Sequence, residues 1–269
     1  MEKIKRAILV ISFGTSYKET QEKTIGGIEK CIAGAFPEYK FYRAWTSPRI
    51  RAKLQKRDGI HVPDIGEAME QMLADGIREA VVQPTYILQG FESGKMEEKV
   101  AACAGRFEKL VFGKPLLVSG EDKKAVAQAL DGAYRRQEGD CLLFMGHGTE
   151  HEANVLYKEL EDLFRSMGMN DVYMGTVEGD FSLANFLTRI AGQHYRRICL
   201  APFMIVAGDH AINDMAGEKE DSWKSVIEKN GYETECILKG LGEFEAVREI
   251  FTEHVREAVR SFEEDKKES

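Results

Sequence analysis

Short apolar runs alternate along the chain with segments whose apolar residues recur at the spacing of an amphipathic helix. Continuous apolar runs of roughly four to eight residues are typical of strands that are buried on both faces. Ile25, Ile28 and Ile32 show the helical spacing in the first intervening segment. The predicted strands are Ala7–Ile11, Lys40–Ala44, Ala80–Gln83, Pro115–Val118, Cys141–Met145, Val172–Gly175, Arg197–Ala201 and Thr234–Leu238.

Segments of helical period separate these strands. Residues 25–35 and 65–73 carry apolar faces. Further helices are predicted over Gly94–Leu110, Asp122–Arg136, His151–Met167, Asp180–Ala191, Lys219–Lys229 and Phe244–Phe262. Strands separated by helices predict right-handed crossovers and parallel sheets that are covered on both faces. The chain is therefore predicted to be an α/β protein.

The two halves of the chain resemble each other in three places and in the same order. Residues 7–15 match 141–149, residues 42–47 run parallel to 173–178, and residues 83–92 match 201–210. Three ordered matches indicate an internal duplication. We predict two similar domains, each a four-stranded parallel sheet flanked by helices, with a cleft between them. Residues 1–120 with the final helix 243–269 form the first domain, and 121–242 form the second.

Candidate chemistry lies where predicted strands end. His147 follows one strand of the second half, and His210 stands shortly beyond another. Ligand and catalytic groups of α/β proteins collect outside the carboxyl ends of strands. Two imidazoles there suggest one shared site for a metal ion or a proton transfer. The second half is therefore predicted to carry the chemistry. It has His147, Glu178 and His210 where the first half has Phe13, Ser47 and Glu92.

The first half holds extra residues after Ser47. Ser47 suits a helix N-cap, Pro48 the first helical position and Gly59 the stop. Ile50 and Leu54 share one face of this predicted helix. The rest of its surface is basic and carries five cations, Arg49, Arg51, Lys53, Lys56 and Arg57.

Composition excludes several classes of protein. The formal net charge of −8 argues against a nucleic-acid partner, which needs a positive face. No run approaches the roughly 18 apolar residues of a membrane helix, and no signal peptide is expected from the residues at the N-terminus. A cytoplasmic location is expected. The five cysteines are scattered without a CxxC pair, so a cysteine metal cage is not expected.

Several motifs resemble the anaerobic cobalt chelatases of the CbiK type. They include GHG at 146–148, the Val177-Glu178 pair and AGDHAINDM at 207–215. SFGTS at 12–16 and RDGI at 57–60 also fit, as do DSWK at 221–224 and GLGE at 240–243. The resemblance covers nearly the whole chain, and the long AGDHAINDM string makes it specific.

The resemblance implies a class II chelatase, which uses no nucleotide and inserts a divalent metal into the tetrapyrrole sirohydrochlorin during anaerobic cobalamin synthesis. Co²⁺ would be the substrate metal. His147, Glu178 and His210 match the family's metal-binding positions, and His147 also matches its proton acceptor. Glu92 matches an acid on the facing side of the cleft.

Two histidines and a carboxylate leave open positions on a metal ion, as delivery requires. His147 cannot ligate and accept a proton through the same lone pair at once. It would therefore release the metal and then take a pyrrole proton. Sirohydrochlorin carries eight carboxylates, which arginine binds well. The predicted substrate contacts are Phe13, Arg49, Arg51, Lys53 and Arg57.

Other interpretations stay open at this stage. A non-catalytic carrier of a tetrapyrrole or a metal would use the same cleft without a base. A phosphate-ester enzyme or nucleotide sensor would use the Ser12–Ser16 loop, although that loop lacks GxGxxG and a P-loop lysine. Nickel and iron suit the same ligands as cobalt. His151 could be an accessory ligand, and the sequence leaves a homo-oligomer open.

Overall fold

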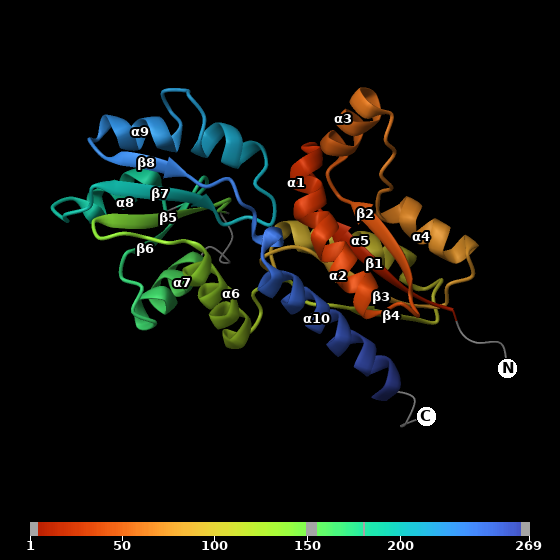
Figure 1. Cartoon of the computed structure of the whole chain (residues 1–269). Coiled ribbons are helices and arrows are strands. Elements are labelled where there is room, and N and C mark those ends of the chain that lie inside the picture. Colours follow the sequence, from red (N-terminus) through yellow and green to blue (C-terminus); the bar gives the residue numbers. More distant parts are fainter. Residues whose placement is uncertain (1–4, 149–154, 180, 265–269) are drawn as a thin grey trace. The chain divides into compact units, whose positions relative to one another are not determined.

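The computed structural model describes residues 5–148, 155–179 and 181–264 of the 269-residue chain (Figure 1). Two compact units divide it: residues 1–118 with 245–269, and residues 119–244. The boundaries expected from the sequence were 120/121 and 242/243. The predicted cleft between the halves stays a prediction.

The first unit is built on a parallel four-stranded sheet in the order β2-β1-β3-β4. β1 is almost wholly buried because Ile8 and Val10 face one layer of helices and Leu9 and Ile11 face the other. Its strands are β1 (Arg6–Ser12), β2 (Lys40–Trp45), β3 (Glu79–Pro84) and β4 (Lys109–Phe112).

Helices cover both faces of this first sheet. Met69, Met72 and Met96 pack against Leu9 and Ile11 on one face. On the other face, α10 lies along α2 and also contacts β3 (Figure 1). The helices of this unit are α1 (Lys18–Lys23), α2 (Ile25–Ala35), α3 (Pro48–Asp58), α4 (Ile65–Ala74), α5 (Phe91–Ala104) and α10 (Glu245–Glu264).

The second unit repeats this plan with the sheet order β6-β5-β7-β8, again parallel. Phe144 packs between Tyr134, Phe164 and Phe203 on one face of the sheet. Its strands are β5 (Asp140–Gly146), β6 (Val172–Thr176), β7 (Arg197–Pro202) and β8 (Glu233–Cys236). Its helices are α6 (Gly120–Ala133), α7 (Val155–Ser166), α8 (Leu183–Ile190), η2 (His210–Met215), α9 (Trp223–Lys229) and η3 (Leu241–Glu243).

The strand register reproduces the sequence repeat residue by residue. Ile11 pairs with Pro84 in the first sheet, and Met145 pairs with Pro202 in the second. The loops repeat as well. The Ser47 amide donates to the Phe13 carbonyl at 3.2 Å, and the equivalent Glu178 amide donates to the His147 carbonyl at 3.0 Å. The expected fold class, two similar four-stranded parallel α/β sheets flanked by helices, is confirmed.

One predicted strand is wrong. Pro115–Val118 forms no strand, and the fourth strand of the first sheet is β4, which begins within the last two residues of the segment predicted as the helix Gly94–Leu110. That helix ends at Ala104, before Gly105. Pro115 lacks an amide hydrogen. The amides of Leu116 and Leu117 donate to the carbonyls of Tyr86 and Ile87, beyond the end of β3.

The basic helix is confirmed as α3. The Ser47 hydroxyl accepts from the Ile50 amide at 3.4 Å, Pro48 opens the helix, and Gly59 ends it in the left-handed region at φ 68°. Leu54 is its buried residue.

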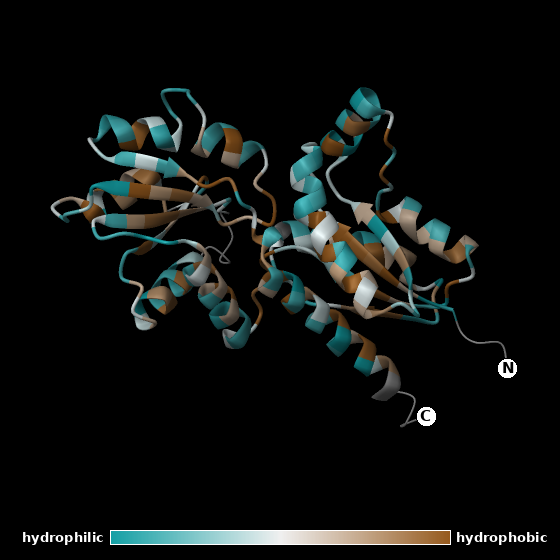
Figure 2. Ribbon diagram, viewed as in Figure 1, coloured by the Kyte–Doolittle hydropathy of each residue, from teal (hydrophilic) through white to brown (hydrophobic). Residues whose placement is uncertain are grey.

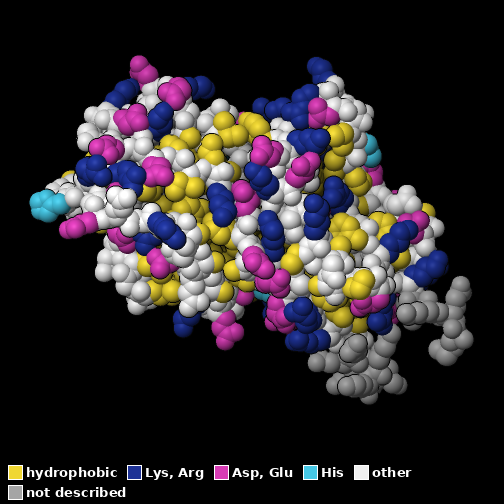
Figure 3. All heavy atoms as spheres, viewed as in Figure 1, with side chains coloured by type: hydrophobic (Ala, Val, Ile, Leu, Met, Phe, Trp, Pro, Cys, Tyr) yellow, Lys and Arg dark blue, Asp and Glu magenta, His cyan; other side chains and the backbone are white. Residues whose placement is uncertain are grey.

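Apolar residues run along the central strands of each sheet, and polar residues lie on the outer faces of the helices (Figure 2). Charged side chains of both signs cover the visible surface, and Lys and Arg gather over α3 (Figure 3). Among the described residues, no helix combines the length and the apolar character that crossing a bilayer needs.

Candidate metal-binding and proton-transfer site

Two loops of the second unit bring His147 and His210 together. His147 is the first residue after β5, the strand that pairs with both β6 and β7. His210 opens η2, which follows the loop after β7. The centroids of the two imidazole rings lie 4.9 Å apart, and their planes cross at 86°. The structure therefore places two predicted ligands side by side.

Hydrogen bonds assign the tautomer of each ring. Nδ1 of His147 lies 3.2 Å from the Gly148 carbonyl oxygen, and Nδ1 of His210 lies 2.6 Å from Oδ2 of Asp214. A carbonyl oxygen and an ionised carboxylate only accept, so each Nδ1 carries the hydrogen. When the ring is neutral, each Nε2 then keeps a free lone pair. Neutral imidazole nitrogen in that form binds divalent transition metals and also accepts protons.

Glycines on either side of His147 fix its loop. A Cβ on Gly146 would stand 2.3 Å from the Tyr157 ring. Gly148 has a φ of 79°, and a Cβ there would stand 2.0 Å from the Glu178 carbonyl oxygen. These close approaches need the absence of a side chain. The close packing of Gly148 brings the His147 loop against the loop that carries Glu178. The Glu178 amide also donates to the His147 carbonyl at 3.0 Å.

The turn that carries His210 is a π-helix. The Ala216 amide donates to the Ala211 carbonyl at 3.1 Å, five residues back. Ala211 and Met215 are fully buried and anchor this turn in the core, whereas the His210 side chain is 40% exposed. Single π turns frequently occur at functional sites. Here the turn leaves the imidazole accessible on a fixed base.

Glu178 has an exposed side chain in the loop after β6. Among the described residues, no three His, Cys, Asp or Glu side chains group closely enough to hold a metal ion. The structure thus joins the two imidazoles and the Glu178 backbone. The Glu178 carboxylate as a third ligand stays a prediction, and His151 lies outside the described residues.

The corresponding positions of the first unit carry different groups. Phe13 follows β1 and is 50% exposed. Glu92 lies in the first turn of α5, where Nζ of Lys95 approaches its carboxylate at 3.4 Å. Near it, burial is the main cause that raises the pKa of the Tyr86 hydroxyl to about 12. That hydroxyl lies 3.1 Å from Oγ1 of Thr46.

The cations of α3 differ in whether they already form ion pairs with carboxylates of the protein. Arg51 pairs with the cap and first turn of α4, at 3.3 Å from Asp64. Arg57 lies 2.6 Å from Asp58 and also donates to the Ser16 carbonyl at 2.8 Å. The Lys53 ammonium lies 5.7 Å from the centroid of the Tyr17 ring, and Arg49 is exposed.

Sequence reasoning missed two supporting residues, Asp214 and Tyr157. Asp214 stands inside the AGDHAINDM motif, four residues after His210. Residues at this spacing face each other on a helical turn, so the spacing was the available signal. Tyr157 gave no such signal, because its packing against Gly146 depends on how α7 crosses the sheet.

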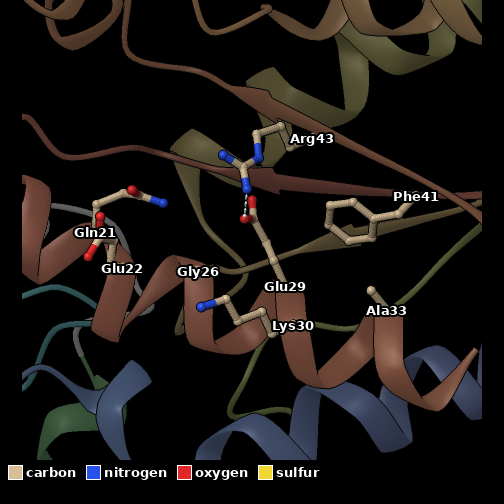
Figure 4. A pocket seen from close by; sticks show the side chains of 8 residues that line it. All are labelled: Gln21, Glu22, Gly26, Glu29, Lys30, Ala33, Phe41 and Arg43. Carbon is tan, nitrogen blue, oxygen red and sulfur yellow. Dashed lines mark hydrogen bonds and ion pairs between the residues drawn. The ribbon is translucent and has the colours of Figure 1, made fainter. Parts of the chain in front are cut away.

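A separate hollow of about 350 Å³ lies in the first unit, between the first two helices and β2 (Figure 4). Its lining includes the buried Glu29, which pairs with Arg43 of the edge strand (Figure 4). None of the predicted site residues lines it.

Comparisons with known proteins identify the family of this chain. A family model, "Cobalt chelatase (CbiK)", matches residues 6–260. A sirohydrochlorin cobaltochelatase of Salmonella typhimurium is 35% identical over 261 residues, which are 95% of this chain and 97% of that protein. Sirohydrochlorin cobaltochelatase CbiKC of Nitratidesulfovibrio vulgaris is 29% identical over 97% of this chain and 93% of its own length.

A solved structure shares the fold. SirB from Bacillus subtilis with Fe³⁺ superposes with a TM-score of 0.68 at 16% identity, covering 96% of this chain and 97% of SirB. The family match spans nearly every described residue, including His147 and His210. The chain therefore belongs to the CbiK cobalt chelatase family.

Proposed function

We propose that this protein is a sirohydrochlorin cobaltochelatase, which inserts Co²⁺ into sirohydrochlorin and releases two protons without a nucleotide. The observation that carries the proposal is the pair of imidazoles 4.9 Å apart in a chain of the CbiK family. The relatives from Salmonella typhimurium and Nitratidesulfovibrio vulgaris are described as having this activity.

The free Nε2 atoms of His147 and His210 would receive the substrate metal. Imidazole nitrogens bind divalent metals at about 2.0–2.1 Å, so one ion between two rings requires rings this close. The Glu178 carboxylate is proposed as a third ligand. Three ligands leave positions open for the incoming pyrrole nitrogens, which a closed cage would not.

Proton removal is proposed for His147. Insertion displaces two pyrrole protons, and an imidazole near neutral pH is a suitable acceptor. Because Nδ1 of His147 is occupied by the Gly148 carbonyl, metal and proton compete for the same Nε2. His147 therefore gives up the metal first and accepts a proton afterwards. Glu92 is proposed as a second acid–base group of the reaction.

Substrate carboxylates are proposed to bind the cations of α3, with Phe13 contacting the macrocycle. Arg49 and Lys53 are the first candidates, because neither forms an ion pair with a described carboxylate. Arg51 and Arg57 would have to share or exchange their present partners Asp64 and Asp58.

The experiment is an anaerobic assay that follows the absorption spectrum of sirohydrochlorin after Co²⁺ is added. We expect rapid cobalt insertion by the native protein and loss of insertion in the double variant His147→Ala/His210→Ala. His194→Ala is the matched control, because it removes an exposed histidine of the same unit. Tetrapyrrole binding by the native protein without insertion would instead indicate a carrier, and the proposal would fail.

A further inference from the structure

We propose that Asp214 is a positioning residue that makes His210 the stronger of the two imidazole ligands. This inference rests on the proposed function, in which both histidines hold the substrate metal. It concerns an exposed carboxylate that contacts His210 and is proposed to act through it.

The contact is specific to this pair. Oδ2 of Asp214 lies 2.6 Å from Nδ1 of His210, four residues back on the same turn. Among the described residues, His210 is the one ion-pair partner of Asp214, whereas Glu218 and Glu220 further along the chain pair with lysines. The carboxylate is thus directed at the imidazole and not at a cation.

The turn beneath the pair is rigid. The fully buried residues Ala211 and Met215 hold η2 in the core. Gly217 follows at a point where a Cβ would stand 2.2 Å from the Asn213 carbonyl oxygen. The base on which His210 and Asp214 stand is therefore fixed, and the 2.6 Å contact also fixes the rotation of the ring.

The two imidazoles are supported by acceptors of different strength. His147 donates to a neutral carbonyl at 3.2 Å, and His210 donates to a carboxylate at 2.6 Å. A charged acceptor makes a shorter and stronger hydrogen bond. Carboxylate support raises the strength of a metal-bound imidazole, and removing it typically costs 10- to 100-fold in metal affinity or activity.

This difference assigns an order to the handover. His147, with the weaker support, lets the metal go first and is then free to take a proton. His210, with the carboxylate behind it, keeps hold of the metal until the macrocycle takes it. The two histidines are therefore not interchangeable.

The test is binding of Co²⁺ alone to the full chain, measured by calorimetry, together with steady-state kinetics. Asp214→Ala and the near-isosteric Asp214→Asn are compared with Asp162→Asn. Asp162 is a suitable control because it also lies in an i,i+4 pair of the second unit, with Lys158, and is 51% exposed. We expect Co²⁺ affinity to fall about 10- to 100-fold in both Asp214 variants and to stay unchanged in the control.

Two further measurements separate positioning from general damage. The KM for Co²⁺ should rise while the KM for sirohydrochlorin stays the same. The ¹⁵N signals of the His210 ring should show loss of the single Nδ1–H tautomer in Asp214→Asn, a folded variant in which the charge is absent. Co²⁺ affinity within twofold of the native protein in both Asp214 variants would overturn the inference.

The outcomes also distinguish this inference from the proposed function. If the native protein inserts cobalt and the Asp214 variants bind Co²⁺ normally, the positioning role is wrong and the chelatase activity stands. If the Asp214 variants lose Co²⁺ affinity but the native protein inserts no cobalt, the positioning role stands and the proposed function is wrong.

Discussion

The two halves of this protein share a backbone framework and differ in the side chains at its strand ends. In the first half the Ser47 amide donates to the Phe13 carbonyl, and in the second half the Glu178 amide donates to the His147 carbonyl. Phe13 and His147 therefore occupy the same position, directly after the first strand of each half. The duplicated fold thus supplies a position, and the side chain placed there decides whether it carries chemistry.

The third strands lead into different structures. After β3 the chain forms the regular helix α5, whose Glu92 faces Lys95. After β7 it forms a π-helix, whose His210 faces Asp214. The first half therefore neutralises its acid with a cation, and the second half uses its acid to support an imidazole. The positions after the third strand therefore carry a proposed acid–base group in the first half and a proposed metal ligand in the second.

Buried glutamates mark a second contrast. Glu29 of α2 contacts Arg43 of β2, and Glu161 of α7 accepts from the Met174 amide of β6 at 2.9 Å. Arg43 and Met174 occupy equivalent places in the register. Oε1 of Glu29 has no hydrogen-bond partner among the described residues, whereas Glu161 also binds two arginines, Arg165 and Arg189. The buried carboxylate therefore has its hydrogen bonds filled in the second half, at Glu161, and only partly filled in the first, at Glu29.

The largest expected effect is on turnover, at the equivalent residues His147 and Phe13. His147→Ala should lower kcat for cobalt insertion by about 10²- to 10⁴-fold, because it removes the proposed general base. Phe13→Ala should change mainly the KM for sirohydrochlorin. Initial rates at several sirohydrochlorin concentrations would separate the two. Equal losses of kcat in both variants would break the contrast between the halves.

The next effect is on stability, at Glu161. Glu161→Ala should lower the free energy of unfolding by about 3 kcal/mol, since it leaves Arg165, Arg189 and a buried amide without their carboxylate. Urea denaturation would measure it. Glu29→Gln should cost much less, because it removes a carboxylate that is only half satisfied. A larger loss in Glu29→Gln than in Glu161→Ala would contradict this account.

Glu29 should also make stability depend on pH. Burial is the main cause that raises the pKa of Glu29 from 4.5 to about 7. Below pH 4.5 the carboxyl is protonated whether the chain is folded or not, and above pH 7 it is ionised in both states. The folded state therefore loses up to about 3 kcal/mol as the pH rises between these values.

Urea titrations of the native protein and Glu29→Gln at pH 5 and pH 8 would test this. The stability difference between native and variant should favour the variant more at pH 8 than at pH 5. A difference that is independent of pH, or that changes in the opposite direction, would show that the Glu29 carboxyl titrates normally in the fold.

The smallest effect is expected at α3. Arg49→Gln/Lys53→Gln should raise the KM for sirohydrochlorin several-fold and leave kcat unchanged, because each exposed ion pair contributes no more than about 1 kcal/mol. Arg51→Gln should instead lower stability, since Arg51 binds Asp64 at the start of α4. An unchanged KM in the double variant would remove α3 from the substrate site.

Much of the fold follows from the sequence because both periodicities are strong. The buried strands around Leu9 and Leu143 read as continuous apolar runs, and the repeat fixes their equivalence. β4 was missed because Lys109–Phe112 is short, partly exposed and preceded by helix-forming residues. Its strand character comes from pairing with β3, which no local pattern records.

The two imidazoles of the candidate site could be selected from the sequence, but their geometry could not be predicted from it. His147 and His210 could be chosen from their places after apolar runs. Their separation depends on Gly148, whose backbone packs against Glu178, and on a π-helix, which no local sequence pattern predicts. The role of Asp214 depends on that same turn.

The most direct test of the account is the position of Co²⁺ itself. A crystal of the native protein soaked with Co²⁺ and measured at the cobalt absorption edge would give an anomalous peak at the metal. The account predicts one peak within bonding distance of Nε2 of both His147 and His210, with Asp214 still on Nδ1. A cobalt ion bound elsewhere in the chain, with both Nε2 atoms free, would contradict it.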